Sequence, residues 1–188
     1  MSRGRKAARY LVILISGCLL FAVGTYFLAW KKVEVDPSLN ITPLFIDFTR
    51  QKQEYTGGRK SEDLKTNNFR VKADGSSAES YRCDIQDLPF VLQIRFSTGD
   101  GYSGGGYIVE IIRNRYCISL YHYTDASKTF DFLYDDEYKI LSSKVILDKA
   151  SYKKGDPVSG YAELEVQKRY GPEKYFEKGK GYFSGIVR

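Results

Sequence analysis

Few residues of this chain could carry out catalysis. His122 is the only histidine, so a zinc site built on several histidines cannot form. Cys117 lies five positions before it, and in a strand the two side chains point to opposite faces, which excludes a thiol–imidazole pair. The sequence contains no G-x-S-x-G motif that would expose a nucleophilic serine. We therefore expect no catalytic residue and no cofactor, and keep an envelope hydrolase that uses His122 or clustered carboxylates as an alternative.

A glycine-rich stretch, Gly99-x-Gly101-x-x-Gly104, matches the pattern of nucleotide-binding loops. Dinucleotide binding needs a helix after such a loop, because the helix N-terminus meets the pyrophosphate. The residues that follow, YIVE, predict a strand instead, and Gly106 occupies the position where a kinase loop has valine. We interpret the stretch as a flexible hairpin connection, with Tyr102 and Ser103 at the tip of a binding loop.

An acidic group at residues 131–137 could bind a hard cation such as calcium. Its members are Asp131, Asp135, Asp136 and Glu137. Their spacing does not match an EF-hand loop, so the pattern favours a solvated acidic turn. The sequence therefore predicts no metal site.

The tyrosines are the most informative candidates for function. The chain has 16 of them, and tyrosine offers a large contact area with a polar end at little entropic cost. We predict a binding surface for a protein or a glycan from residues that lie opposite the expected core rows or at the glycine-rich tip. These residues are Tyr102, Tyr121, Tyr123, Tyr161 and Tyr182. The alternative is that a two-sheet fold buries some of them, because alternation alone does not show which face meets solvent.

Alternation of apolar and polar residues predicts the fold that positions these side chains. It is clearest in Val158–Arg169, where Val158, Ala162, Leu164 and Val166 share the core face. In Leu88–Ser97 the core face is formed by Leu88, Phe90, Leu92, Ile94 and Phe96. The predicted strands cover 44–49, 69–72, 88–97, 107–113, 116–124, 129–134, 145–147, 158–169 and 178–188, with Phe183 and Val187 facing inward in the last. This pattern predicts an all-β domain, either a single antiparallel β-sandwich of Ig-like or related type or an open barrel.

The segment Tyr10–Trp30 contains 21 residues and no charge. As a helix it would be about 31 Å long, which matches a hydrocarbon core of about 30 Å. Four basic residues precede it and two follow it, which places the N-terminus in the cytoplasm. The expected organisation is a cytoplasmic N-terminus (1–9), a transmembrane signal-anchor helix (10–30), a juxtamembrane stalk (31–42) and an extracytoplasmic β-domain (43–188), periplasmic or extracellular.

The three cysteines bear on this topology. Ile15-Ser16-Gly17-Cys18 resembles the lipobox of bacterial lipoproteins, which implies lipidation at Cys18 as an alternative to the anchor. The apolar run continues for twelve residues beyond Cys18, so we favour the uncleaved anchor. Outside the cell, oxidising conditions would allow a disulfide between Cys83 and Cys117; the alternative is two unpaired thiols.

Charge excludes one class of partner. The net charge is +6, but four of these charges precede the anchor, so no basic nucleic-acid footprint remains. The sequence therefore predicts a membrane-tethered domain that binds a protein or polymer partner at the cell envelope without catalysis. An envelope-complex component and an immunity-type interceptor of an incoming molecule are two concrete forms of this function.

Overall fold

The structure is a computed structural model of the 188-residue chain. It describes residues 12–17, 24, 30–42, 45, 67–100, 102–124, 137–170 and 172–188. The chain divides into two units, Met1–Lys31 and Lys32–Arg188.

In the first unit, residues 12–17 are helical, and their apolar side chains Val12, Ile13 and Leu14 are each more than 60% exposed. The rest of the predicted anchor, including Cys18, lies outside the described residues, apart from Gly24 and Trp30. Within the part of the chain that the structure describes, no helix has the length and apolar character needed to cross a membrane.

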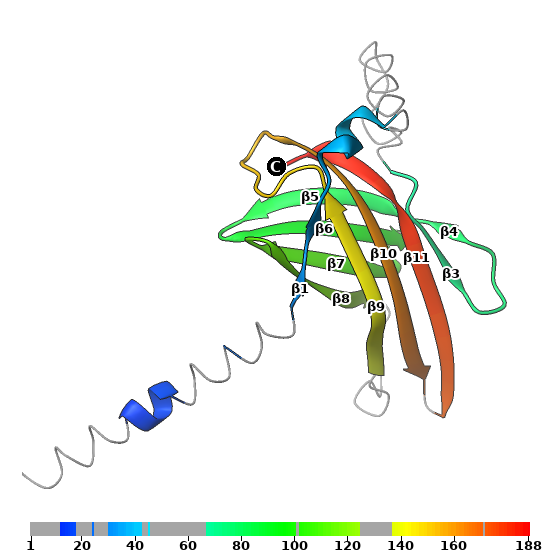
Figure 1. Ribbon diagram of the computed structural model, residues 1–188. Coiled ribbons are helices and arrows are strands. Elements are labelled where there is room, and N and C mark those ends of the chain that lie inside the picture. Colours follow the sequence, from blue (N-terminus) through cyan, green and yellow to red (C-terminus); the bar gives the residue numbers. More distant parts are fainter. Residues whose placement is uncertain are drawn as a thin grey trace, which may run out of the picture. The chain divides into compact units, whose positions relative to one another are not determined.

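The second unit is a two-sheet β-sandwich, which confirms the all-β sandwich part of the predicted fold class (Figure 1). The five-stranded sheet has the order β1-β8-β7-β6-β5 and the six-stranded sheet the order β2-β9-β10-β11-β3-β4. Their bounds are β1 Lys31–Lys32, β2 Glu34–Val35, β3 Arg70–Ala73, β4 Glu79–Ser80, β5 Arg82–Leu88, β6 Val91–Gly99, β7 Ser103–Ile112, β8 Arg115–Thr124, β9 Glu137–Leu147, β10 Pro157–Tyr170 and β11 Glu173–Ile186. One short 3-10 helix, η1, spans Pro37–Ile41.

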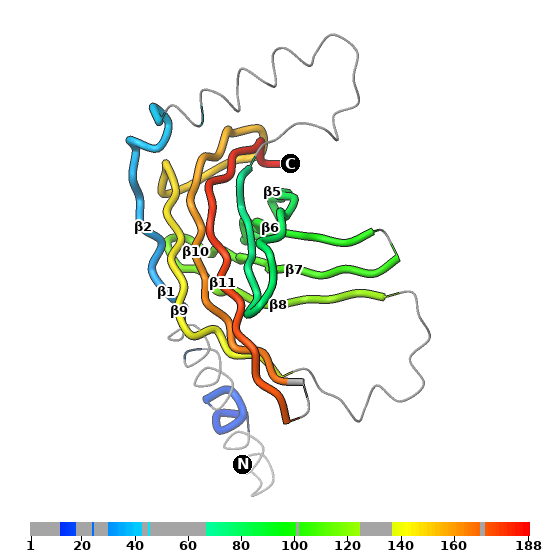
Figure 2. The backbone as a smooth tube through the Cα atoms, turned by 90° about the vertical axis from the view of Figure 1, so that its right-hand side faces the viewer, coloured from blue at the N-terminus to red at the C-terminus, as the bar shows by residue number. Residues whose placement is uncertain are grey.

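Neighbouring strands in the sequence are mostly neighbours in the sheets. Strands β5 to β8 and strands β9 to β11 form two antiparallel meanders, whereas immunoglobulin domains have Greek-key connections. The fold is therefore a sandwich without the Ig topology. Figure 2 shows that β6, β7 and β8 run across the direction of β9, β10 and β11, as in an orthogonal packing of sheets.

The core lies between the two sheets and follows the predicted alternation. Val158, Ala162, Leu164 and Val166 of β10 are almost completely buried, as are Phe183 and Val187. From the other sheet come the alternate residues Ile94 and Phe96 of β6 and Tyr107 and Val109 of β7. These burial values confirm the predicted inward rows. The prediction works because successive side chains of a strand point to opposite faces, so that every second one faces the core.

Phe69, just before β3, is a core residue that alternation did not single out. It is fully buried, and its ring stacks on Phe96 with 4.0 Å between centroids. Gly179 and Gly181 of β11 make room for it, because a Cβ at Gly181 would lie 2.3 Å from the Phe69 Cα. Small residues on one strand thus create the space that a large residue from another strand fills.

The sequence prediction differs from the structure around residues 82–90. Residues 82–88 form β5, a strand that was not predicted apart from Leu88, and a turn separates it from β6. Phe90, predicted to face the core, lies in that turn with φ of 71° and is 94% exposed. Pro89 explains the difference, because proline lacks the N–H that a continuous central strand needs.

The structure also differs from the prediction of a juxtamembrane stalk at residues 31–42. Val33 is buried in the main core, and β2 pairs with the end of β9. Asp36 caps η1 by accepting hydrogen bonds from the Ser38 hydroxyl and the Ser38 N–H, and these bonds, the hydroxyl's first, lower its pKa. Residues 32–42 therefore belong to the domain. The predicted strand 44–49 lies outside the described residues except for Phe45, which is helical, and the predicted strand 129–134 lies outside them entirely.

The predicted disulfide is wrong, because Cys83 and Cys117 are both free thiols. Cys83 lies on β5 and Cys117 on β8, with β6 and β7 between them. Three strand spacings amount to about 14 Å, whereas a disulfide needs Cα atoms within about 7 Å. The sequence distance between the cysteines could not reveal this separation.

Burial raises the pKa of the Cys83 thiol. The thiolate is the reactive form, so we expect iodoacetamide at mildly alkaline pH to modify Cys83 far more slowly in the folded protein than in urea. Peptide mass spectrometry would measure the rate at each cysteine separately. Equal rates in the folded and unfolded protein would contradict the partly buried position of Cys83.

Candidate functional site

A cleft of about 280 Å³ opens where the end of the β6–β7 hairpin approaches the start of β9, the end of β10 and the start of β11. Four tyrosines from different segments line it, and we call it the tyrosine cleft: Tyr81, Tyr121, Tyr138 and Tyr175. Gly104–Gly106, Thr98, Leu120, His122, Glu137 and Lys168 complete the lining. The site therefore combines aromatic rings with one imidazole, one carboxylate and one ammonium group.

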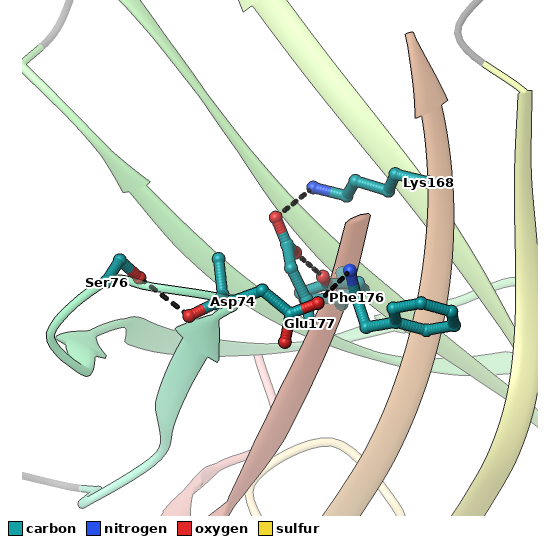
Figure 3. A network of polar contacts seen from close by, with 7 residues as sticks. Asp74, Ser76, Lys168, Phe176 and Glu177 are labelled. Atoms are coloured by element: carbon teal, nitrogen blue, oxygen red, sulfur yellow. Dashed lines mark hydrogen bonds and ion pairs between the residues drawn. The ribbon is translucent and has the colours of Figure 1, made fainter. Parts of the chain in front are cut away.

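A largely buried polar cluster lies at the side of this cleft. Lys168 of β10 and Glu177 of β11 point toward each other, with 2.7 Å between Nζ and Oε1 (Figure 3). The Tyr107 hydroxyl donates a hydrogen bond to the other oxygen of Glu177. The side chains of Lys168 and Glu177 are only 20% and 12% exposed. The carboxylate thus has a partner on each oxygen, which buried charges require.

The same cluster holds one wall of the cleft in place. The Tyr81 ring stacks on Tyr107 with 6.2 Å between centroids, and the Lys168 ammonium lies 5.9 Å from the centre of the Tyr107 ring. Burial, followed by the hydrogen bond to Glu177, raises the pKa of Tyr107, and burial raises that of Tyr81. Both phenols therefore keep their protons to a higher pH than an ordinary tyrosine does.

Asp74 fixes the position of β11 from outside this cluster. Its carboxylate accepts a hydrogen bond from the Phe176 N–H at 3.2 Å, and its own N–H donates to the Phe176 carbonyl at 3.1 Å. Figure 3 shows Asp74 in the turn after β3, beside Phe176 and Glu177. This pair of bonds orders the backbone next to the cleft residue Tyr175.

The predicted tyrosines fall into two groups. Tyr121 lines the cleft, with the Arg95 guanidinium 5.4 Å from its ring centre. Tyr123 and Tyr102 lie at the same end of the five-stranded sheet and are 41% and 74% exposed. Tyr161 and Tyr182 lie instead on the outer face of the six-stranded sheet, 5.0 Å apart by ring centroids. The five residues therefore do not form one continuous surface.

The glycine-rich stretch forms the end of a hairpin. Gly99 pairs with Gly104 and Ser97 with Gly106, so most of the expected loop belongs to β6 and β7. A Cβ at Gly99 or Gly104 would lie 2.8 Å from the Tyr123 hydroxyl. The glycines thus allow the tyrosine to cross the hairpin, which is a structural reason for their presence.

His122 lies at the exposed end of the inward row of β8 and pairs with Gly105. It lines the tyrosine cleft together with Glu137. The hydrolase alternative predicts this gathering beside the glycine-rich stretch. Asp131, Asp135 and Asp136 lie outside the described residues, and within the described part of the chain no group of three or more His, Cys, Asp or Glu residues is placed to bind a metal.

A second, larger depression of about 720 Å³ lies on the outer face of β3, β10 and β11. We call it the outer groove; its lining includes Tyr161, Glu163, Glu165 and Tyr182. The Tyr161 hydroxyl donates to Glu163 at 3.1 Å. Burial and this bond raise the pKa of Tyr161 to about 12. Alternation along β10 correctly predicted that Tyr161, Glu163 and Glu165 face outward. It did not predict the groove that they line.

The raised tyrosine pKa values predict how stability depends on pH. Tyr81, Tyr107, Tyr152 and Tyr161 keep their protons to higher pH in the folded protein than in the unfolded chain, where the pKa is about 10. The unfolded chain therefore loses protons first, so stability falls as the pH rises above about 10 and is unchanged by these groups below it. Urea unfolding at several pH values measures the stability, and tyrosinate absorbance measures the ionisation of the tyrosines. Full tyrosinate absorbance from a folded domain near pH 10 would contradict it.

Chemically, the tyrosine cleft can hold a ring or a side chain against aromatic surfaces, and the outer groove can hold a longer polar ligand. Comparison with protein-family models, curated proteins and solved structures finds no match to this chain.

Proposed function

We propose that the chain is a single-pass membrane protein whose domain, residues 32–188, binds a protein partner at the cell envelope through the tyrosine cleft. The observation that carries the proposal is the convergence of Tyr81, Tyr121, Tyr138 and Tyr175 on one cleft. Tyrosine is enriched among the residues that dominate binding energy at protein interfaces. The buried Glu177–Lys168 pair supports the wall of the cleft, and a site held rigid before binding loses less entropy on association.

Membrane attachment rests on the sequence and on the first unit. Tyr10–Trp30 is uncharged and long enough to span a bilayer, and the helical residues 12–17 expose apolar side chains. The basic residues before this segment favour a cytoplasmic N-terminus and an extracytoplasmic domain. Mass spectrometry of the mature protein tests the attachment: an intact Met1 supports the anchor, whereas a lipidated Cys18 at the N-terminus supports the lipoprotein alternative.

Site-specific crosslinking in the native membrane tests the function. A photoreactive amino acid at position 121 or 138 of the full-length protein should capture the same partner protein. The Tyr121→Ala/Tyr138→Ala variant should lose this partner in a pull-down. Phe90→Ala is the matched control, because Phe90 is an exposed aromatic residue at the opposite end of β6. Equal loss in both variants, or no position-specific capture, would reject the cleft as the binding site.

A hydrolase remains the second candidate, because His122 and Glu137 line the same cleft. The His122→Asn variant separates the two functions. If the chain only binds, the partner leaves chemically unaltered from both the wild-type protein and the variant. A hydrolase would cleave the partner, and His122→Asn would abolish that cleavage.

A further inference from the structure

The outer face of β3 and β11 carries two pairs of like charges in direct register. Lys178 lies opposite Lys72, and Lys180 lies opposite Arg70. Like charges directly opposite each other destabilise an antiparallel pair of strands. All four side chains are exposed. The arrangement weakens the attachment of β3 to the sheet, so stability does not explain it.

Neighbouring acids neutralise this positive strip only in part. Lys178 reaches Glu165 on β10 at 3.1 Å, an exposed contact that contributes little. Within the described part of the chain, Arg70, Lys72 and Lys180 form no ion pair. The groove lining therefore contains four cationic side chains and two carboxylates, which leaves an excess of positive charge.

The order of charges across the groove repeats. One row reads Glu163, Lys180, Arg70, and the row two residues away reads Glu165, Lys178, Lys72. Two residues along a strand correspond to about 7 Å. Each row thus offers a carboxylate at one side and two cations at the other, so the groove presents the same set of groups twice.

We propose that the outer groove binds an anionic glycan, a chain of sugar units that carry carboxylate or phosphate groups. The cations would pair with the acid groups, and Glu163 and Glu165 would accept hydrogen bonds from sugar hydroxyls. Tyr161 and Tyr182, which line the same groove, offer rings for contact with the apolar face of a sugar. The two glutamates would repel a polyanion that has no hydroxyl groups to donate hydrogen bonds to them. This site is separate from the tyrosine cleft and does not depend on the function proposed for it.

Direct titration of the full-length protein in an uncharged detergent tests the proposal. The probes are polygalacturonate, which has one carboxylate on each sugar, uncharged dextran, and poly-L-glutamate, which has the charge without the sugar. We expect binding of polygalacturonate, at least about tenfold weaker binding of poly-L-glutamate, and none of dextran. Equal affinity for the two anions, or no binding of polygalacturonate at physiological salt, would overturn the proposal.

Two double variants separate a built site from general charge attraction. Lys72→Gln/Lys180→Gln removes one cation from each row and should weaken polygalacturonate binding about tenfold. Lys153→Gln/Lys154→Gln removes the same charge from an exposed turn outside the groove and should leave binding unchanged. An equal loss in the two variants would overturn the proposal.

Stability gives an independent readout. Because Lys72 and Lys180 each face a like charge, Lys72→Gln/Lys180→Gln should raise the urea midpoint while it weakens binding. A lowered midpoint would show that the cations stabilise the fold, and the argument for a ligand would fail. The Tyr121→Ala/Tyr138→Ala variant should bind polygalacturonate normally, so failure of the tyrosine cleft and failure of the outer groove can be told apart.

Discussion

Replacement of Gly181 by alanine should destabilise the domain by about 3 kcal/mol, near the upper end for an overpacked core. The new Cβ would lie 2.3 Å from the Phe69 Cα and 2.6 Å from the Phe69 nitrogen. These are backbone atoms, so no side-chain rotation relieves the contact. The segment around Phe69 must move away from β11, and the stacking of Phe69 on Phe96 is weakened. Urea unfolding followed by circular dichroism measures the loss.

Gly185→Ala on the same strand is the matched control. The nearest atom to a Cβ at Gly185 is the Ile85 Cδ1, at 2.9 Å, and this flexible end can rotate away. We expect a cost of about 1 kcal/mol. If the two substitutions shifted the urea midpoint equally, Phe69 would not occupy the space above Gly181.

Glu177→Ala should cost about 3 kcal/mol or more, because it removes one partner of a buried ion pair. Lys168 would keep its charge without a counterion, and the Tyr107 hydroxyl would lose its acceptor. Glu177→Gln retains an oxygen for Tyr107 and should cost less. Equilibrium unfolding of the two variants gives the difference directly.

A double substitution makes this second prediction sharper. Lys168→Met/Glu177→Leu replaces both charges by apolar side chains, so no charge remains buried. Such replacements are often neutral or stabilising, and we expect this variant to be more stable than Glu177→Ala. If the double variant were the less stable of the two, then the charges would contribute more than their desolvation costs.

Alternation along single strands predicted the core of β10 and β11 well. It works there because each strand is long and has one buried face, so the alternation of apolar and polar residues repeats many times. It failed at Phe90, where Pro89 ends the strand, and it overlooked β5. In β5 only Cys83 and Ile85 form an alternating apolar pair, and their neighbours are polar or charged. This pattern is too short to distinguish from a loop.

The tyrosine cleft could not be predicted in the same way, because its residues come from six strands and from Tyr81 before β5. Pairing across a sandwich depends on how the sheets cross, which no local pattern records. One signal was present, however. Lys168 continues the inward row of Val158, Leu164 and Val166, and Glu177 has the same parity as Phe183. Two opposite charges on core-facing positions of neighbouring strands indicate a buried pair.

The distance between Cys83 and Cys117 also affects how the chain matures. With no covalent bond to form between them, these two cysteines require neither an oxidase nor a disulfide isomerase. The strand pairs β5–β6, β6–β7, β7–β8, β9–β10 and β10–β11 each join neighbours in the sequence, and such local pairings favour rapid folding. Folding of the domain therefore does not depend on a bond between Cys83 and Cys117.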